Sequence, residues 1–231
     1  YIGSKVRCNI CKASYATFAP YGNRTNAKCP RCGSLERHRL ILEYLKEKTE
    51  FFKSRNNKIR VLHFAPEEFF YNSFKNNRQI DYFPCDLFPE IFPFDKDKLM
   101  QKVDVLEIPY EDNYFDYILC NHVLEHVPDD HTAMSELYRV IKTGGLGIFQ
   151  VPIDDNLDNT YEDFSITDEK GREKAFGQKD HVRWYGKDYK TKLANSGFSV
   201  NEDHFVKSFT KEELFKNGFL NKELIYCCTK K

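Results

Sequence analysis

The chain has 231 residues, 41% of them hydrophobic and 15% aromatic, which is enough for a sizeable core and excludes a largely disordered protein. Lys plus Arg and Asp plus Glu both number 35, so the net charge indicates no class of partner. Apolar runs fall far short of the roughly 20 residues that span a membrane, and no export signal opens the sequence, so we expect a soluble, cytoplasmic protein of undetermined oligomeric state.

The charge is distributed unevenly along the chain. Residues 1–60 hold 14 basic and 4 acidic residues, a balance of +10, whereas residues 61–231 hold 21 basic and 31 acidic residues, a balance of −10. This contrast predicts two modules joined by the polar stretch 53–57. We expect a small module plus helix over residues 1–50 and a larger domain over 58–231.

Two Cys-x2-Cys pairs open the chain, Cys8 with Cys11 and Cys29 with Cys32, and 17 residues separate them. This spacing is typical of a tetrahedral zinc site, and zinc thiolates fit a reducing compartment. Residues 6–33 lack a core of their own, so metal binding would supply their folding energy. A closed four-thiolate site has no open coordination position, so we predict structural Zn²⁺, with iron as the alternative.

Beyond the cysteines, helix and strand patterns alternate. A helix with Ser34 as its N-cap is expected over 34–48. Apolar runs then predict five strands and an intervening helix that stops at two glycines; the strands are 58–65, 80–85, 101–105, 115–120 and 146–151, and the helix is 129–142. This alternation favours an α/β fold with a parallel sheet and helices on both faces. A helix at 189–196 and an antiparallel strand pair, 198–209 with 223–229, close the chain.

The segment 103–127 resembles the central region of class I S-adenosylmethionine (SAM)-dependent methyltransferases. An acidic residue, an Ile-Pro-Tyr phrase followed by Asp, a Phe-Asp pair and a Leu-Glu-His turn occur in the family's order. In this sequence they are Asp104, residues 108–110, Asp112, residues 115–116 and residues 124–126. The resemblance covers roughly residues 58–231. It implies a Rossmann-like, seven-stranded, mostly parallel sheet in the order 3-2-1-4-5-7-6, with strand seven antiparallel, beside an N-terminal zinc ribbon.

The first motif of that family departs from its usual form. The expected glycine-rich loop is replaced by the stretch 61–68, which has no glycine and contains Pro66, a residue without a backbone N–H donor. However, this Val-Leu-His-x-Ala-Pro-Glu phrase, the cysteine-containing stretch 29–39 and the Asp-His-Val-Arg stretch 177–186 together are similar to a subset of the family that carries the zinc knuckle. SAM is therefore the expected cofactor.

Two aspartates are placed to bind that cofactor, since ligands of open parallel sheets bind at the carboxyl ends of the strands. Asp86 follows the second expected strand and can accept from ribose hydroxyls, and Asp104 follows the third and can accept from the adenine amino group. The alternative is that both are solvated loop acids. The full set of predicted cofactor-binding residues is Ala65, Pro66, Glu67, Asp86, Leu87, Asp104, Val105, Asn121 and His122.

The stretch 154–186 is long, polar and poorly periodic, and a structureless insertion of this kind is usually a lid or a binding loop. It follows the fifth strand, near the edge where an acceptor would lie. We predict substrate contacts from four of its residues, which are Tyr161, Glu162, Asp163 and Arg183. Arg37, in the Arg-His-Arg run after the second cysteine pair, could hold a phosphate-bearing substrate; the alternative is a helix-surface cluster.

Methyl transfer to a hydroxyl needs a base, and histidine beside a carboxylate is suited to that role near neutral pH. His181 with the adjacent Asp180 is the first candidate, and a hydrogen bond that closes the lid is its alternative role. His122, directly after the fourth strand, is the second candidate. His126 is interpreted as a packing residue at a helix start.

The resemblance to the zinc-knuckle subset implies an O-methyltransferase acting on a sugar or polysaccharide-precursor hydroxyl, with a small-molecule or sugar-linked acceptor. A zinc-containing ribosomal RNA methyltransferase is one alternative, favoured by the basic residues 1–60, because phosphate contacts dominate nucleic-acid affinity. The acidic remainder of the chain disfavours a nucleic-acid partner. A non-catalytic, zinc-stapled binding protein on a decayed methyltransferase fold is the other alternative, and it rests on the missing glycines.

Overall fold

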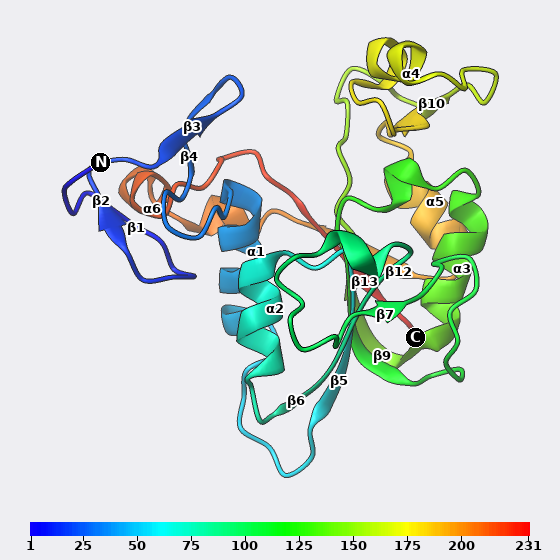
Figure 1. Ribbon diagram of the computed structural model, residues 1–231, viewed down its shortest axis with the longest axis horizontal. Coiled ribbons are helices and arrows are strands. Elements are labelled where there is room, and N and C mark those ends of the chain that lie inside the picture. Colours follow the sequence, from blue (N-terminus) through cyan, green and yellow to red (C-terminus); the bar gives the residue numbers. More distant parts are fainter. The chain divides into compact units, whose positions relative to one another are not determined.

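The computed structural model describes residues 1–231, which form two compact units (Figure 1). The first unit consists of residues 1–57, 68–79 and 203–225, and the second of residues 58–67, 80–202 and 226–231. Each unit is therefore assembled from separated stretches of sequence, unlike the consecutive ranges expected. None of the helices combines the length and the apolar character that a membrane span requires.

The main sheet has seven strands in the order β12-β13-β9-β8-β5-β6-β7. Neighbours from β7 to β9 are parallel, and β13 runs antiparallel to β9. The strands are β5 (Ile59–Phe64), β6 (Ile80–Asp86), β7 (Gln101–Lys102), β8 (Phe115–Cys120), β9 (Ile141–Ile148), β12 (Ser199–Asp203) and β13 (Ile225–Thr229). This confirms the α/β class, the sheet order and the antiparallel strand expected from the sequence.

The two central strands are β5 and β8, and their sequences explain the position. Both are almost entirely buried, as parallel strands covered on both faces require. Their register pairs Val61 with Tyr117 and Phe64 with Cys120, so the two strands end level with each other. The residues that follow them therefore lie at one edge of the sheet.

The remaining elements of the second unit are the 3-10 turns η1 (Pro89–Ile91) and η2 (Leu124–His126), α3 (Asp130–Val140), α4 (Glu169–Phe176), α5 (Tyr189–Asn195) and the hairpin of β10 (Tyr161–Glu162) with β11 (Arg183–Trp184). Asp129 caps α3 by accepting from the Thr132 backbone N–H at 3.0 Å. The prediction that 154–186 lacks secondary structure is wrong, since it holds α4 and the β10–β11 hairpin.

Several boundaries also differ from the expectations. The strand expected over 198–209 ends at Asp203 and gives way to the 3-10 turn η3 (Phe205–Ser208), and that expected over 146–151 begins at Ile141. Two helices of the first unit were not predicted, α2 (Glu68–Lys75) and α6 (Lys211–Asn217). Phe70 and Phe74 of α2 stack at 5.4 Å, and Phe74 packs on Phe51, so α2 is stabilised by packing and not by local signals.

The N-terminal part of the first unit consists of two hairpins and a small core. β1 (Val6–Arg7) pairs with β2 (Ser14–Tyr15), β3 (Ala19–Tyr21) pairs with β4 (Arg24–Lys28), and α1 (Glu36–Glu47) follows them. Val6, Cys8, Phe18 and Cys29 form the core of this region. Four side chains are too few to fold such a segment alone, so a further constraint must hold it together.

Arg39 of α1 supplies part of that constraint. Its guanidinium is fully buried and donates to the backbone carbonyls of Ala27, Ser34, Asn217 and Gly218 at 2.7–2.9 Å. Gly218, the C-cap of α6, has φ of 60°, and a Cβ there would lie 2.7 Å from the guanidinium. Arg39 therefore joins the β-hairpins to α6 and is not exposed to a phosphate-bearing ligand.

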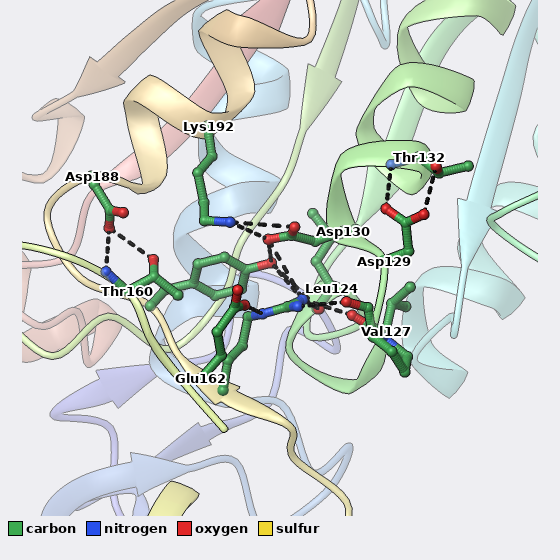
Figure 2. A network of polar contacts seen from close by, with 12 residues as sticks. Leu124, Val127, Asp129, Asp130, Thr132, Thr160, Glu162, Asp188 and Lys192 are labelled. Atoms are coloured by element: carbon green, nitrogen blue, oxygen red, sulfur yellow. Dashed lines mark hydrogen bonds and ion pairs between the residues drawn. The ribbon is translucent and has the colours of Figure 1, made fainter. Parts of the chain in front are cut away.

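A second buried arginine organises the second unit. Arg183 is 1% exposed and donates to the carbonyls of Leu124, Val127 and Pro128 at 3.1, 2.6 and 2.8 Å, and to the Glu162 carboxylate at 2.9 Å (Figure 2). These contacts correct the expectation that Arg183 contacts an acceptor, because its donors are already used within the protein. The side chain instead joins β11 to the turn 124–128.

The same network includes the start of α3. Asp130 is buried and accepts from the Tyr185 hydroxyl at 2.8 Å and from Lys192 at 3.0 Å (Figure 2). Its carboxylate also lies 3.5 Å from a guanidinium nitrogen of Arg183. The buried positive charge of Arg183 is therefore balanced by two carboxylates, those of Asp130 and Glu162.

We expect Arg183→Met to lower the free energy of unfolding by about 3–5 kcal/mol, because it leaves buried carboxylate and carbonyl groups without their donor. Lys187→Met is the matched control, since Lys187 makes only an exposed ion pair with Asp158 and its loss should not change stability measurably. Urea unfolding followed by circular dichroism compares the two variants. Equal midpoints for the parent and Arg183→Met would contradict the assigned role.

Candidate functional site

The carboxyl edge of the parallel strands brings together the predicted cofactor-binding residues of the second unit. Ala65 follows β5, Asp86 ends β6, Asp104 follows β7 and Asn121 follows β8. Because β5 lies between β6 and β8, these residues come from adjacent strands. This is the edge at which open α/β sheets bind ligands.

Asp86 and Asp104 have the same local geometry. Oδ1 of Asp86 accepts from the Phe88 N–H at 2.8 Å, and Oδ1 of Asp104 accepts from the Leu106 N–H at 2.9 Å. In each case this hydrogen bond fixes the aspartate side chain through Oδ1, and Oδ2 remains for a ligand. Burial raises the pKa of Asp86, whereas Asp104 is exposed and lines an open cavity together with Leu87.

The stretch that replaces the glycine-rich loop retains one feature of such loops. Ala65 has φ of 45°, in the left-handed region that glycine normally occupies, and its N–H donates to the Cys85 carbonyl at 2.9 Å. Pro66 is buried. Glu67 lies 3.5 Å from Nε2 of the fully buried His63. Ala65 therefore adopts the left-handed backbone conformation that a glycine would supply, with only a methyl side chain at that position.

Asn121 and His122 end β8 with unpaired polar atoms. Asn121 is 5% exposed, and neither its amide nitrogen nor its amide oxygen has a hydrogen-bond partner. His122 has φ of 56°, and its backbone N–H donates to the Gln150 carbonyl at 2.7 Å. Unpaired buried polar groups are rare in folded proteins, and a bound ligand, ion or water is a common reason for them.

The ring of His122 is oriented by a buried carboxylate that sequence reasoning missed. Nδ1 of His122 lies 3.1 Å from Oε1 of Glu125, a residue that is only 1% exposed. Since a carboxylate accepts, Nδ1 carries the proton and the lone pair is on Nε2, which has no partner in the protein. Glu125 was read as part of a helix-start phrase, although its spacing of three residues from His122 was the available signal.

His181 is also buried, at 2% exposure. Its Nδ1 lies 3.2 Å from the Phe176 carbonyl, so Nδ1 donates, and Nε2 has no partner. Burial lowers the pKa of His181, which keeps the ring neutral. It packs edge-on against the ring of His126 at a centroid distance of 4.8 Å.

The expected pairing of Asp180 with His181 is not observed. The Asp180 carboxylate and carbonyl lie 3.4 and 3.3 Å from Nδ1 of His126, because adjacent residues of an extended segment point in different directions. His126, interpreted from the sequence as a packing residue, therefore has a carboxylate partner. His181 is oriented by the Phe176 carbonyl instead.

The predicted substrate residues do not converge on one point. Tyr161 is 44% exposed and packs on Phe176, Glu162 is bound to Arg183, and Asp163 accepts from the Ser165 N–H and hydroxyl. Arg37 lies on α1 of the first unit. Of the four predicted in the second unit, Tyr161 and Glu162 are exposed, Asp163 is half-buried and Arg183 is buried.

The four N-terminal cysteines form a compact cluster in the first unit. Sγ of Cys8 lies 3.7 Å from that of Cys32, Sγ of Cys11 lies 3.6 Å from that of Cys29, and all four lie within 4.8 Å of one another. A tetrahedral zinc site with Zn–S bonds of about 2.3 Å has sulfur–sulfur edges of about 3.8 Å. The cluster therefore has the dimensions of a four-thiolate metal site.

Comparisons with known proteins agree with the architecture. Residues 71–149 match the family described as "Methyltransferase domain". A stretch of 42 residues is 48% identical to demethylmenaquinone methyltransferase of Oceanobacillus iheyensis, covering 18% of each chain. A stretch of 86 residues is 29% identical to sterol 24-C-methyltransferase erg6 of Schizosaccharomyces pombe, covering 37% of this chain and 23% of that protein. The matched stretches thus span less than a quarter of either relative's length.

The fold is also similar to that of an S-adenosylmethionine-dependent methyltransferase from Mesorhizobium loti, with a TM-score of 0.53, 11% identity, and coverage of 74% of this chain and 91% of that chain. Residues 71–149 therefore match a methyltransferase domain, and the chain has a fold like that of this solved methyltransferase. The matched range 71–149 includes Asp86, Asp104, Asn121, His122 and Glu125. The four cysteines and His181 lie outside the matched range.

Proposed function

We propose that the protein transfers the methyl group of SAM to a hydroxyl group, and that the acceptor is a sugar or a polysaccharide precursor. The observation that carries this proposal is the His122–Glu125 pair at the end of β8. The pair holds an imidazole with its lone pair on an unpartnered Nε2, at the sheet edge where the domain's cofactor would bind. A hydroxyl must lose a proton when it is methylated, and this nitrogen can receive it.

The residues at the edge fit the cofactor. The two unpartnered amide atoms of Asn121, the left-handed backbone at Ala65 and the available Oδ2 atoms of Asp86 and Asp104 are all groups that a nucleoside with an amino-acid tail could satisfy. SAM, when bound, supplies an electrophilic methyl group on sulfur. The residues proposed to hold it are Ala65, Pro66, Glu67, Asp86, Leu87, Asp104, Val105, Asn121 and His122.

His122 is better placed than His181 to act as the base. The side chain of His122 is 29% exposed, so an acceptor can reach it, whereas His181 is 2% exposed. Glu125 holds Nδ1–H and thereby fixes the tautomer, and its negative charge stabilises the imidazolium that forms when Nε2 takes the proton. His122 is thus the proposed catalytic residue and Glu125 the positioning residue.

The choice of a sugar acceptor rests on the resemblance and on the segment 154–186. Proteins similar to the zinc-knuckle subset often accompany enzymes of surface-polysaccharide synthesis. The segment exposes two aromatic rings, Tyr161 at 44% and Phe164 at 53%, among many polar groups. Aromatic faces beside hydrogen-bonding side chains suit a ligand with an apolar face and a hydroxylated rim.

We also propose that the four-cysteine cluster binds one structural Zn²⁺. Cys8, Cys11, Cys29 and Cys32 would occupy all four coordination positions, which leaves none for a substrate. The Ser34 hydroxyl lies 3.2 Å from Sγ of Cys32 and 3.5 Å from Sγ of Cys8, so it can donate to a thiolate and orient it. The metal would supply folding energy that the small core of this region lacks.

We expect Asp86→Ala and Asp104→Ala each to weaken binding of S-adenosylhomocysteine by about 1–3 kcal/mol, because cofactor donors lose their acceptor. Isothermal titration calorimetry measures the change, with the exposed Glu111→Ala as the control. Affinities of both aspartate variants within twofold of the parent would reject this placement of the cofactor.

We expect Cys29→Ser to remove one zinc equivalent per chain, because a three-thiolate site loses its closed shell. Elemental analysis of dialysed protein reports the metal content. Proteolysis should then cut residues 1–33 before the rest of the chain. Cys227→Ser, a buried cysteine of β13 outside the cluster, should retain the parent's zinc. Equal zinc in parent and Cys29→Ser would contradict a metal at this cluster.

We expect His122→Ala to lower kcat by roughly 10²–10⁴, the usual contribution of a general base. The assay follows S-adenosylhomocysteine release with a panel of sugars and sugar nucleotides. Glu125→Gln, which retains the shape of the side chain and removes its charge, should lower kcat less. His131→Ala, an exposed residue of α3, should retain the parent rate. A His122→Ala variant within threefold of the parent, with methyl transfer rate-limiting, would reject the assignment.

A further inference from the structure

Three side chains beside the proposed base form a second cluster of potential metal ligands. Glu125, His126 and His181 each present one ligand atom, and these atoms all lie within 4.8 Å of one another. They come from η2 and from the segment just before β11, which the Val182 N–H to Glu125 carbonyl hydrogen bond of 3.0 Å holds together. All three belong to the second unit.

Two of these ligand atoms are buried and have no partner in the protein. Oε2 of Glu125 and Nε2 of His181 make no hydrogen bond, and their residues are 1% and 2% exposed. Leaving a buried acceptor without a donor is unfavourable, and more so for a charged group. In the neutral Nδ1–H tautomer of His181 both atoms are acceptors and do not bond to each other, whereas one cation bound between them satisfies both.

The outer contacts of the cluster are those that orient metal ligands. Metal-bound histidines usually donate their other ring N–H to a carbonyl or carboxylate. Nδ1 of His181 faces the Phe176 carbonyl, and Nδ1 of His126 faces Asp180, which leaves Nε2 of each ring for a metal. The second oxygen of Glu125 is bound to Nδ1 of His122, so the carboxylate is also fixed.

We propose that Glu125, His126 and His181 bind one divalent cation of the first transition row. Two imidazoles and one carboxylate suit Zn²⁺, Fe²⁺ or Co²⁺ better than Mg²⁺ or Ca²⁺, which prefer oxygen ligands. Bonds of about 2.0–2.2 Å place such ligand atoms roughly 3.4 Å apart, so the cation draws the side chains together by about 1 Å. This site differs from the cysteine cluster in ligand type and leaves coordination positions open.

The open positions give the cation a role in the reaction, and this step rests on the proposed function. A Lewis acid beside His122 lowers the pKa of an acceptor hydroxyl that binds to it. The hydroxyl proton goes to Nε2 of His122, the acceptor oxygen forms the new bond to the methyl carbon, and the electron pair of the broken carbon–sulfur bond stays on sulfur. No oxidant or further reactant is needed.

Co²⁺ titration of the zinc-loaded protein tests the site directly. We expect one Co²⁺ per chain with the d–d absorption of nitrogen and oxygen ligands and without thiolate charge-transfer bands. His181→Gln and Glu125→Gln should weaken this binding tenfold or more, and the exposed His131→Gln should bind as the parent does. Equal Co²⁺ affinity in all four proteins, or cobalt bound only by thiolates, would overturn the proposal.

Two further measurements keep the test decisive. If circular dichroism shows that His181→Gln is unfolded, His126→Gln, whose side chain is 33% exposed, replaces it with the same expected loss. Cobalt binding that these variants abolish supports the site even if no acceptor is methylated, which would reject the proposed function alone. Methyl transfer that proceeds at the parent rate in a variant without cobalt binding would reject the metal's role and leave the proposed function standing.

Discussion

The buried guanidinium of Arg183 is the interaction on which the geometry of the candidate site depends. The turn 124–128 contains only a short 3-10 helix, which leaves most of its carbonyls without a helical partner, and Arg183 donates to the carbonyls of Leu124, Val127 and Pro128. That turn carries Glu125 and His126, and His181 lies two residues before the arginine. The Arg183 guanidinium therefore fixes both the turn that carries Glu125 and His126 and the segment that carries His181. Asp130 and Glu162 balance its charge. Site and scaffold are coupled here, because the side chains that hold the turn also set the position of the proposed base.

The backbone directly after β5 and β8 adopts an unusual conformation at the sheet edge. Ala65 and His122 both have positive φ, which costs residues with a Cβ about 1–2 kcal/mol. Both lie at the sheet edge where the cofactor would bind. The missing glycines of the first motif thus do not mean that the bend is missing, and this weakens the argument for a decayed, non-catalytic fold. The burial of Arg39 and Arg183 likewise removes two cations that an RNA-binding surface would need.

The central strands of the sheet could be predicted from the sequence because each is marked by a run of apolar residues within the strand itself. The apolar runs of β5 and β8 mark these strands without reference to distant residues, whereas the double glycine predicted to end α3 lies within β9. Helix α2 was missed because it is stabilised by the packing of Phe74 on Phe51, a contact between distant residues that no local pattern reveals. At the site, His122 was predicted from its position after a strand, and His181 from its place in the polar stretch 154–186 beside Asp180. The partners were not, because Glu125 reaches His122 across a turn and Asp180 turns away from its neighbour.

The most direct test of the account is a crystal structure of the protein with S-adenosylhomocysteine. We predict the adenine amino group at Asp104, the ribose hydroxyls at Asp86 and the sulfur atom facing Asn121 and His122, on the side of the edge where Glu125 and His181 lie. A sulfur atom directed away from His122, or a cofactor bound at another edge of the sheet, would contradict the claim that this histidine cluster performs the methyl-transfer chemistry.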